Sequence, residues 1–213
     1  MIKISILCTD SLHPANGYLE SWIEAQSSDV QVKIFRDIRE LVGGDFLFLI
    51  SCHQFVNKAV RKNFRYSLVL HASDLPFGRG MSPHVWQILE GAGQIILTLL
   101  NADDKIDYGD IWHQHLIKLN GTELYNEIDD LLFRAELLLL DWALKNCDRA
   151  IPRKQIGNIT FYPRRTPADS KIDPTKSLAE IFDLLRVSNP DRYPVHFDYR
   201  GETYKLRIEK IKL

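Results

Sequence analysis

The sequence predicts an α/β protein with a Rossmann-like, mostly parallel sheet, helices on both faces, and a small C-terminal helix and β-hairpin. Short apolar runs alternate with segments of helical periodicity through the first half of the chain. Hydrophobic residues make up 45% of the 213 residues, which is enough for a sizeable core. From Pro152 the composition becomes basic and turn-rich. We therefore expect a main domain over residues 1–152 and an extension over residues 153–213 that packs on it.

The predicted strands are apolar or alternating runs at residues 2–8, 30–34, 45–51, 67–71, 95–100 and 110–118. The predicted helices lie at residues 18–25, 37–41, 55–62, 83–90 and 122–147, the last of them capped by Thr122. This alternation indicates parallel βαβ units, and the last two strands form a hairpin. The extension adds a helix at residues 177–187 and a hairpin of residues 195–199 and 203–211.

Charge and cysteine content limit the classes of function. The net charge of −1 comes from balanced charges, so we expect no nucleic-acid partner and no membrane partner. Three scattered cysteines indicate reduced thiols, and neither a signal peptide nor a membrane-spanning run is present, so we expect a cytoplasmic protein. His113 and His115 alternate on a strand without a third ligand, so no metal site is expected.

The stretch from His71 to Pro83 carries the strongest functional signal. A predicted strand ends on His71, a Pro- and Gly-rich loop follows, and Ser82 and Pro83 resemble the N-cap and first residue of a helix. In open α/β sheets, ligands bind at the carboxyl edge of the strands. His71 is therefore a candidate general base, with Ser73 on the same face, although a lone histidine here equally suits a structural role.

Two other groups are candidates by position. Asp110 stands at the foot of a strand, where it could hold an imidazole in one tautomer, whereas Asp103 and Asp104 suit turn chemistry. The segment 164–166 (Arg-Arg-Thr) follows two aromatic residues, and paired guanidinium groups beside aromatic rings bind diphosphates as well as forming ordinary solvated surface.

These residues together resemble the folate-dependent formyltransferase family, which includes methionyl-tRNA formyltransferase and nucleotide-sugar N-formyltransferases. The resemblance covers residues 45–210 in the family's order. The matching segments are His71-x-Ser73-x-Leu75-Pro76-x-x-Arg79-Gly80, Asp107-x-Gly109-Asp110-Ile111, Tyr162-x-Arg164-Arg165-Thr166-Pro167, and Arg186-x-x-Asn189-Pro190.

The resemblance implies that the co-substrate is 10-formyltetrahydrofolate and that the acceptor is a primary amine. His71 would deprotonate the amine or stabilise the tetrahedral intermediate, and Asp110 would orient that imidazole. The ends of the third strand and the turn before residue 110 would bind the pterin. The residues implied there are Ser51, Cys52, Phe55, Ala102, Asp104, Ile106 and Asp107, and those implied for the acceptor are Arg79, Arg164, Arg165 and Thr166.

One position departs from the family's pattern. The family's catalytic asparagine, two residues before the histidine, falls at Val69, which has no group to donate to an oxyanion. Losing one such donor commonly lowers the rate about 100- to 1,000-fold. Our hypothesis is that the chain is active and that His53 partly compensates; backbone groups and water are the alternatives.

The resemblance favours a nucleotide-linked amino sugar as acceptor. Short members with His-x-Ser-Asp-Leu-Pro most resemble those acting on UDP-linked 4-amino sugars of pseudaminic acid biosynthesis, and dTDP- or GDP-linked 4-amino sugars are equally compatible. The alternatives are a glycinamide ribonucleotide-type formyltransferase and a non-catalytic folate or nucleotide-sugar binding protein, for which Val69 is the best support. The long helix and the C-terminal hairpin are both candidate surfaces for a homodimer.

Overall fold

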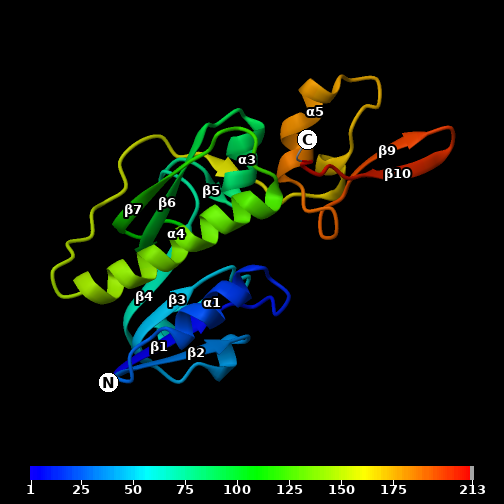
Figure 1. Ribbon diagram of the computed structural model, residues 1–213. Helices are drawn as coiled ribbons and strands as arrows, with labels where there is room; N and C mark the ends of the chain where they lie inside the picture. The colour runs from blue at the N-terminus through cyan, green and yellow to red at the C-terminus, as the bar shows by residue number, and fades with distance from the viewer. Residues whose placement is uncertain (212–213) are drawn as a thin grey trace.

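The computed structural model describes residues 1–211 and contains a mixed six-stranded sheet with the order β2-β1-β3-β4-β6-β7 (Figure 1). The strands are β1 (Ile2–Leu7), β2 (Val30–Phe35), β3 (Gly44–Leu49), β4 (Phe64–His71), β6 (Gln94–Asn101) and β7 (Ile111–Lys118). Each predicted strand of the sheet overlaps one of these. The α/β, Rossmann-like fold class is confirmed.

The sheet is parallel in one half and antiparallel in the other. β1 pairs in parallel with β2 and β3, and β3 with β4, whereas β6 is antiparallel to both β4 and β7. The β6–β7 hairpin is confirmed, but the parallel unit expected across the helix at 83–90 is wrong. That helix, α3 (Pro83–Leu89), has 7 residues and is about 10 Å long, whereas the 8-residue β4 is about 26 Å long. Because α3 is too short to bring the chain back, β6 begins at the edge where β4 ends.

Helices cover the two faces of the sheet unequally. α1 (Ala15–Glu24) and α4 (Tyr125–Asn146) pack on one face, over the main apolar core that includes Ile4 and Ile6. On the opposite face, Leu7 belongs to a smaller cluster near the short helices η1 (Ile38–Glu40) and α2 (Lys58–Arg61). The alternation of Ile6 and Leu7 between the two clusters follows the two-residue period of a strand.

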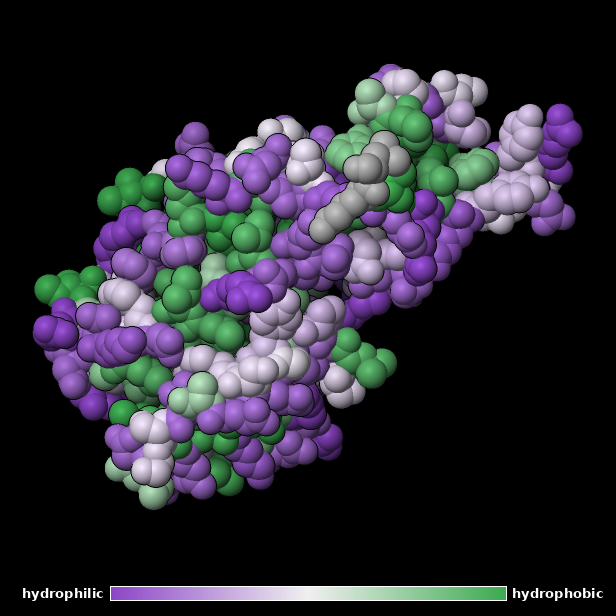
Figure 2. Space-filling model, viewed as in Figure 1, coloured by the Kyte–Doolittle hydropathy of each residue, from purple (hydrophilic) through white to green (hydrophobic). Residues whose placement is uncertain are grey.

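The C-terminal residues form a smaller unit at one end of the molecule (Figure 1). α5 (Leu178–Val187) and the hairpin β9 (Val195–Tyr199)–β10 (Glu202–Leu206) surround a cluster that contains Ile181 and Val195. An ion pair of 2.5 Å between Arg192 and Asp10 joins this unit to the loop after β1. In the view of Figure 2, the hairpin projects from the body, and hydrophobic residues lie in separate patches among hydrophilic ones. The division at residue 152 stays a prediction.

Two helix starts differ from the sequence prediction. Ser82 precedes α3 with a left-handed backbone (φ +48°) and makes no side-chain bond to the helix, although Pro83 takes the first helical position as predicted. Thr122 is not the cap of α4, because that helix begins at Tyr125 and the Glu127 carboxylate accepts the backbone N–H of Leu124 at 2.7 Å. Within residues 1–211, no helix is long and apolar enough to cross a membrane.

A buried acid in α4 makes stability depend on pH. Burial, with the nearby charge of Asp129, raises the pKa of the Glu136 carboxyl from 4.5 to about 8, and its side chain is 8% exposed. The folded protein therefore holds a proton that the unfolded chain releases between these two values. The stability that this bound proton gives to the folded state is fully present below pH 4.5 and is lost as pH rises through 8.

We therefore predict that Glu136→Gln, which is neutral at every pH, gains stability relative to the wild type by up to about 4 kcal/mol between pH 5 and pH 9. Denaturant unfolding across this range measures the difference. Glu20→Gln on the exposed face of α1 is the matched control and should run parallel to the wild type. A difference between Glu136→Gln and wild type that does not change with pH would contradict the prediction.

Candidate functional site

His71 ends β4 at the carboxyl edge of the parallel half of the sheet. It pairs with Thr98 of β6, and its side chain is 7% exposed. Its Nε2 lies 2.8 Å from the carbonyl oxygen of Gly78, and because a carbonyl only accepts, Nε2 carries the proton. The other ring nitrogen, Nδ1, is thereby left to face a different group.

That group is Asp107. Its Oδ1 lies 3.6 Å from Nδ1 of His71, and both side chains are buried. The expected contact between His71 and Asp110 is wrong: Asp110 binds Nζ of Lys154 at 3.0 Å. The tight turn explains the difference, because a Cβ on Gly109 would stand 1.8 Å from the carbonyl oxygen of Asn101. The chain has already joined the β6–β7 ladder at Asp110, whereas Asp107 lies inside the turn.

The short strand β5 (Arg79–Gly80) and the glycine before it hold the two members of this pair together. The Gly78 carbonyl binds His71, and the Gly80 N–H donates to Oδ2 of Asp107 at 3.0 Å. β5 pairs in parallel with β8 (Phe161–Tyr162), so closely that a Cβ on Gly80 would lie 2.2 Å from the Tyr162 carbonyl oxygen. With its φ of +102°, this position requires glycine.

Arg79 is buried instead of facing a substrate. Its side chain is 3% exposed, its Nε donates to the Asp107 carbonyl at 3.0 Å, and its guanidinium lies 3.4 Å from the centre of the Tyr108 ring. The prediction that Arg79 binds the acceptor is therefore corrected: this guanidinium supports the turn that carries Asp107. Burial could not be deduced from the residue type, because arginine is usually exposed.

Neighbouring residues of the same loop are also enclosed. The Ser73 hydroxyl is buried and has no hydrogen-bond partner within the described residues, while the Ser73 carbonyl accepts from Thr98 Oγ1 at 2.7 Å. Val69 packs in an apolar cluster with Leu75 and Leu100, so its position offers no donor to a ligand.

The comparisons with known proteins agree with this fold. No protein-family model matches the chain. The methionyl-tRNA formyltransferase of Clostridium beijerinckii is 30% identical over 167 residues, which are 76% of this chain and 53% of that protein. The chain spans about half the length of the curated relatives it matches.

Two solved structures show how widely the fold is shared. A 4-N formyltransferase from Francisella tularensis has a TM-score of 0.74 at 21% identity, covering 100% of this chain and 99% of that one. HypX from Aquifex aeolicus in complex with tetrahydrofolic acid has a TM-score of 0.82 at 17% identity, covering 97% of this chain and 37% of that one. The chain belongs to the methionyl-tRNA formyltransferase-like family.

The residues after β3 lie at the same edge. Ser51 has a left-handed backbone (φ +47°), and its Oγ is 3.1 Å from Nε2 of His13. The Cys52 thiol is half-buried, and burial raises its pKa, which argues against a nucleophile. His53 and Phe55 are exposed, and the backbone N–H of His53 donates to Thr9 Oγ1 at 2.9 Å.

The turn between β6 and β7 exposes both charged side chains (Asp103, Asp104 and Lys105) and the apolar Ile106. The Ala102 N–H donates to the Ser67 carbonyl at 2.8 Å, which attaches the turn to β4. Asp104 pairs with Arg61 at 2.6 Å, and Ile106 is 68% exposed. Ser51, Cys52, Phe55, Ala102, Asp104 and Ile106 keep their assignment to a folate site as a prediction, whereas Asp107 lies against His71.

The predicted arginine segment borders the C-terminal unit. Arg164 is exposed, whereas Arg165 is half-buried, with Nη2 3.0 Å from Ser170 Oγ and Nε without a partner among the described residues. Thr166 begins the short helix η2 (Pro167–Ser170), and both its N–H and its hydroxyl donate to Asp169. Among the described residues, the side chains of Arg165 and Thr166 are hydrogen-bonded, whereas the exposed Arg164 side chain has no such bond.

Two further histidines flank His71. Burial, with the nearby charges of His13, His71 and Arg165, lowers the pKa of His84 to about 4. Burial, with the charge of Arg192, lowers the pKa of His13 to about 4 as well. Both imidazoles are therefore neutral at neutral pH. The structure thus brings together neutral rings from the β1–α1 loop and α3 near the histidine that ends β4.

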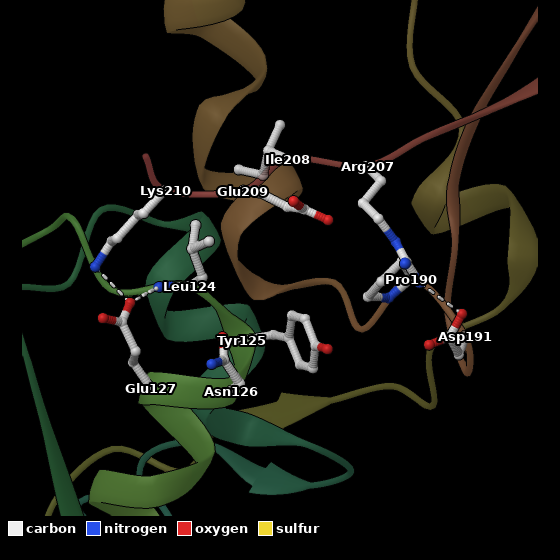
Figure 3. Close-up of a pocket in the computed structure, with 10 residues that line it drawn as sticks. All are labelled: Leu124, Tyr125, Asn126, Glu127, Pro190, Asp191, Arg207, Ile208, Glu209 and Lys210. Carbon is white, nitrogen blue, oxygen red and sulfur yellow. Dashed lines mark hydrogen bonds and ion pairs between the residues drawn. The ribbon is translucent and has the colours of Figure 1, made fainter. Parts of the chain in front are cut away.

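A pocket of about 390 Å³ lies away from this edge, between the start of α4 and the tail after β10 (Figure 3). Its charged side chains are largely paired, Arg207 with Asp191 at 2.8 Å and Lys210 with Glu127 at 2.5 Å. None of the predicted site residues lines it, so it is not part of the candidate site. Within residues 1–211, no cluster of three or more His, Cys, Asp or Glu side chains is arranged to hold a metal ion.

We predict that Gly80→Ala lowers the free energy of unfolding by about 2–4 kcal/mol, because its Cβ would meet the Tyr162 carbonyl in a backbone conformation that alanine rarely adopts. Thermal or denaturant unfolding measures the loss. Gly93→Ala is the matched control, since nothing lies within 4 Å of its Cβ position, and it should stay within about 0.5 kcal/mol of wild type. Equal stability of the two variants would contradict the close approach of β5 and β8.

Proposed function

We propose that this chain transfers the formyl group of 10-formyltetrahydrofolate to the primary amine of a nucleotide-linked amino sugar. The observation that carries the proposal is the buried His71–Asp107 pair at the carboxyl end of β4, in a fold shared with formyltransferases. A histidine backed by a carboxylate is a group that accepts a proton near neutral pH and stabilises the resulting positive charge.

The proposed reaction follows from this geometry. The amine nitrogen attacks the formyl carbon and forms a tetrahedral intermediate, and the bond from that carbon to N10 of the folate then breaks. His71 Nδ1 takes the proton that the amine loses, and the proton passes to N10 as tetrahydrofolate leaves. The 3.6 Å between Nδ1 and Asp107 is longer than a hydrogen bond, so Nδ1 is open to an amine while the carboxylate stays near.

The negative charge on the intermediate needs a donor that Val69 does not supply. His53 follows β3, the strand that pairs with β4, and its exposed side chain can approach a ligand at this edge. We retain His53 as the proposed partial replacement for the family's asparagine. Backbone N–H groups at the end of β3 and ordered water are the alternatives.

The folate would bind between the segment after β3 and the turn before β7. Exposed Phe55 offers a ring face to the pterin, exposed Ile106 offers apolar surface, and the backbone of both segments offers hydrogen bonds to its edge. The ion pair of Asp104 with Arg61 attaches the turn to α2 on that side of the proposed folate site.

The amino-sugar acceptor is supported by similarity and by charge. The Francisella tularensis 4-N formyltransferase matches 100% of this chain, including the C-terminal unit. Arg164 and Arg165 lie beside that unit and suit a nucleotide diphosphate. We propose a 4-amino sugar, with the UDP-linked precursor of pseudaminic acid as the first candidate. A homodimer and a cytoplasmic location stay predictions.

The test is a formyl-transfer assay with 10-formyltetrahydrofolate and three kinds of amine: a UDP-linked 4-amino sugar, a dTDP-linked 4-amino sugar and glycinamide ribonucleotide. We expect tetrahydrofolate release and a formylated product with at least one nucleotide sugar. Turnover with glycinamide ribonucleotide alone would support that alternative. Measurable binding of folate and nucleotide sugar without any turnover would support the non-catalytic alternative and overturn the proposal.

A further inference from the structure

The start of the C-terminal extension is built into the loop that carries Asp107. The backbones of Arg153 and Ile111 exchange two hydrogen bonds of 2.8 Å, which fix this segment beside β7. A few residues later, Thr160 Oγ1 accepts the N–H of Gly78 at 2.7 Å, and Tyr162 pairs with Gly80. Residues 153–162 therefore cross over the turn between these two attachments.

Between these attachments, one side chain enters the turn. Gln155 donates from Nε2 to the carbonyl oxygens of Asp107 and Gly109, both at 2.8 Å, and its Oε1 accepts from Arg79 Nη2 at 2.5 Å. It is half-buried, whereas the side chain of the next residue, Ile156, is 88% exposed. Both ends of the Gln155 amide are thus engaged by the turn and by Arg79.

Asp107 is therefore held from two sides. Its main-chain carbonyl accepts from Gln155 Nε2 and from Arg79 Nε, and its carboxylate accepts from the Gly80 N–H. The residue has a left-handed backbone with φ +60°, a conformation uncommon outside glycine but one that aspartate adopts more readily than most residues. Neither Gln155 nor Arg79 is a hydrogen-bond partner of His71, whose Nε2 binds the Gly78 carbonyl and whose Nδ1 lies 3.6 Å from Asp107.

We propose that Gln155 and Arg79 are positioning residues for the reaction, fixing the Asp107 carboxylate opposite His71. This inference rests on the proposed formyl transfer. Arg79 then positions Asp107 and does not bind the acceptor. The C-terminal extension takes part in the catalytic geometry through Gln155. Without Gln155 the turn loses two donors, and the carboxylate moves relative to the imidazole.

The expected effect is on turnover more than on binding. Misplacement of a catalytic group by about 1 Å commonly lowers the rate up to about 100-fold. We expect Gln155→Ala to lower kcat about 10- to 100-fold with the KM for 10-formyltetrahydrofolate unchanged. In an Asp107→Asn background, the same change should lower kcat no further, because the carboxylate that it positions is already gone.

The matched control is Ile156→Ala, which truncates the exposed neighbour and should keep the kcat of the wild type. Arg79→Lys is the second variant. Lysine keeps the charge but cannot donate at the same time to the Asp107 carbonyl and to Oε1 of Gln155, so this change should lower kcat as Gln155→Ala does. Unchanged kcat in Gln155→Ala, or an equal loss in the wild-type and Asp107→Asn backgrounds, overturns the inference.

A measurement without turnover separates this inference from the proposed function. Hydrogen exchange of the Gly80 amide, read by NMR in the full chain, reports the bond from Gly80 to the Asp107 carboxylate. Exchange should be faster in Gln155→Ala and unchanged in Ile156→Ala. If exchange is the same in both variants, the inference fails even where the enzyme is active. A wild-type chain without formyl transfer overturns the function and, with it, the catalytic role of Gln155.

Discussion

The pairing of His71 with Asp107 is the contact on which the rest of the site depends. The two residues are 36 positions apart in the chain, and the structure brings Oδ1 of one to 3.6 Å from Nδ1 of the other. The segment Gly78–Gly80 supplies the Gly78 carbonyl to the imidazole and the Gly80 N–H to the carboxylate. Both side chains are buried, so once Nδ1 of His71 takes a proton, water screens its attraction to the Asp107 carboxylate only weakly.

The register of β6 places the turn that carries Asp107 near the end of β4. Because β6 runs antiparallel to β4, Asn101 at its end lies opposite Leu68, three residues before His71. The turn that follows closes where the Asn101 N–H donates to the Asp110 carbonyl at 2.9 Å. The residues between these two loop back beside the end of β4. The register of β6, which ends opposite Leu68 and does not run on toward Phe64, keeps this turn close to His71.

The sequence was sufficient for the fold class and for the position of His71 at a strand end before a glycine loop, because both are local signals. It could not choose between Asp107 and Asp110, since both stand in one motif and only the left-handed backbone of Asp107 decides which carboxylate turns inward. Gln155 carried no signal at all: its role comes from a crossing segment that composition marks only as turn-rich. Arg79 was assigned to the acceptor because residue type gives no measure of burial.

The C-terminal residues contribute more than an appendage would. Gln155 bonds the turn that holds Asp107, Tyr162 pairs with Gly80, and Arg192 forms an ion pair with Asp10 in the loop after β1. Each contact joins this part of the chain to a loop near the carboxyl edge of the sheet. The proposed nucleotide-sugar contacts of Arg164 and Arg165 lie on the same stretch, so acceptor binding and carboxylate placement share one segment.

The most direct measurement is a double-mutant cycle on formyl transfer with His71→Ala, Asp107→Asn and the double variant, alongside Asp110→Asn. If His71 and Asp107 act as one unit, Asp107→Asn lowers kcat/KM by at least about 100-fold. The double variant is then no slower than His71→Ala alone, and Asp110→Asn stays near the wild type. Activity near the wild type in Asp107→Asn, with a large loss in Asp110→Asn, would contradict this pairing.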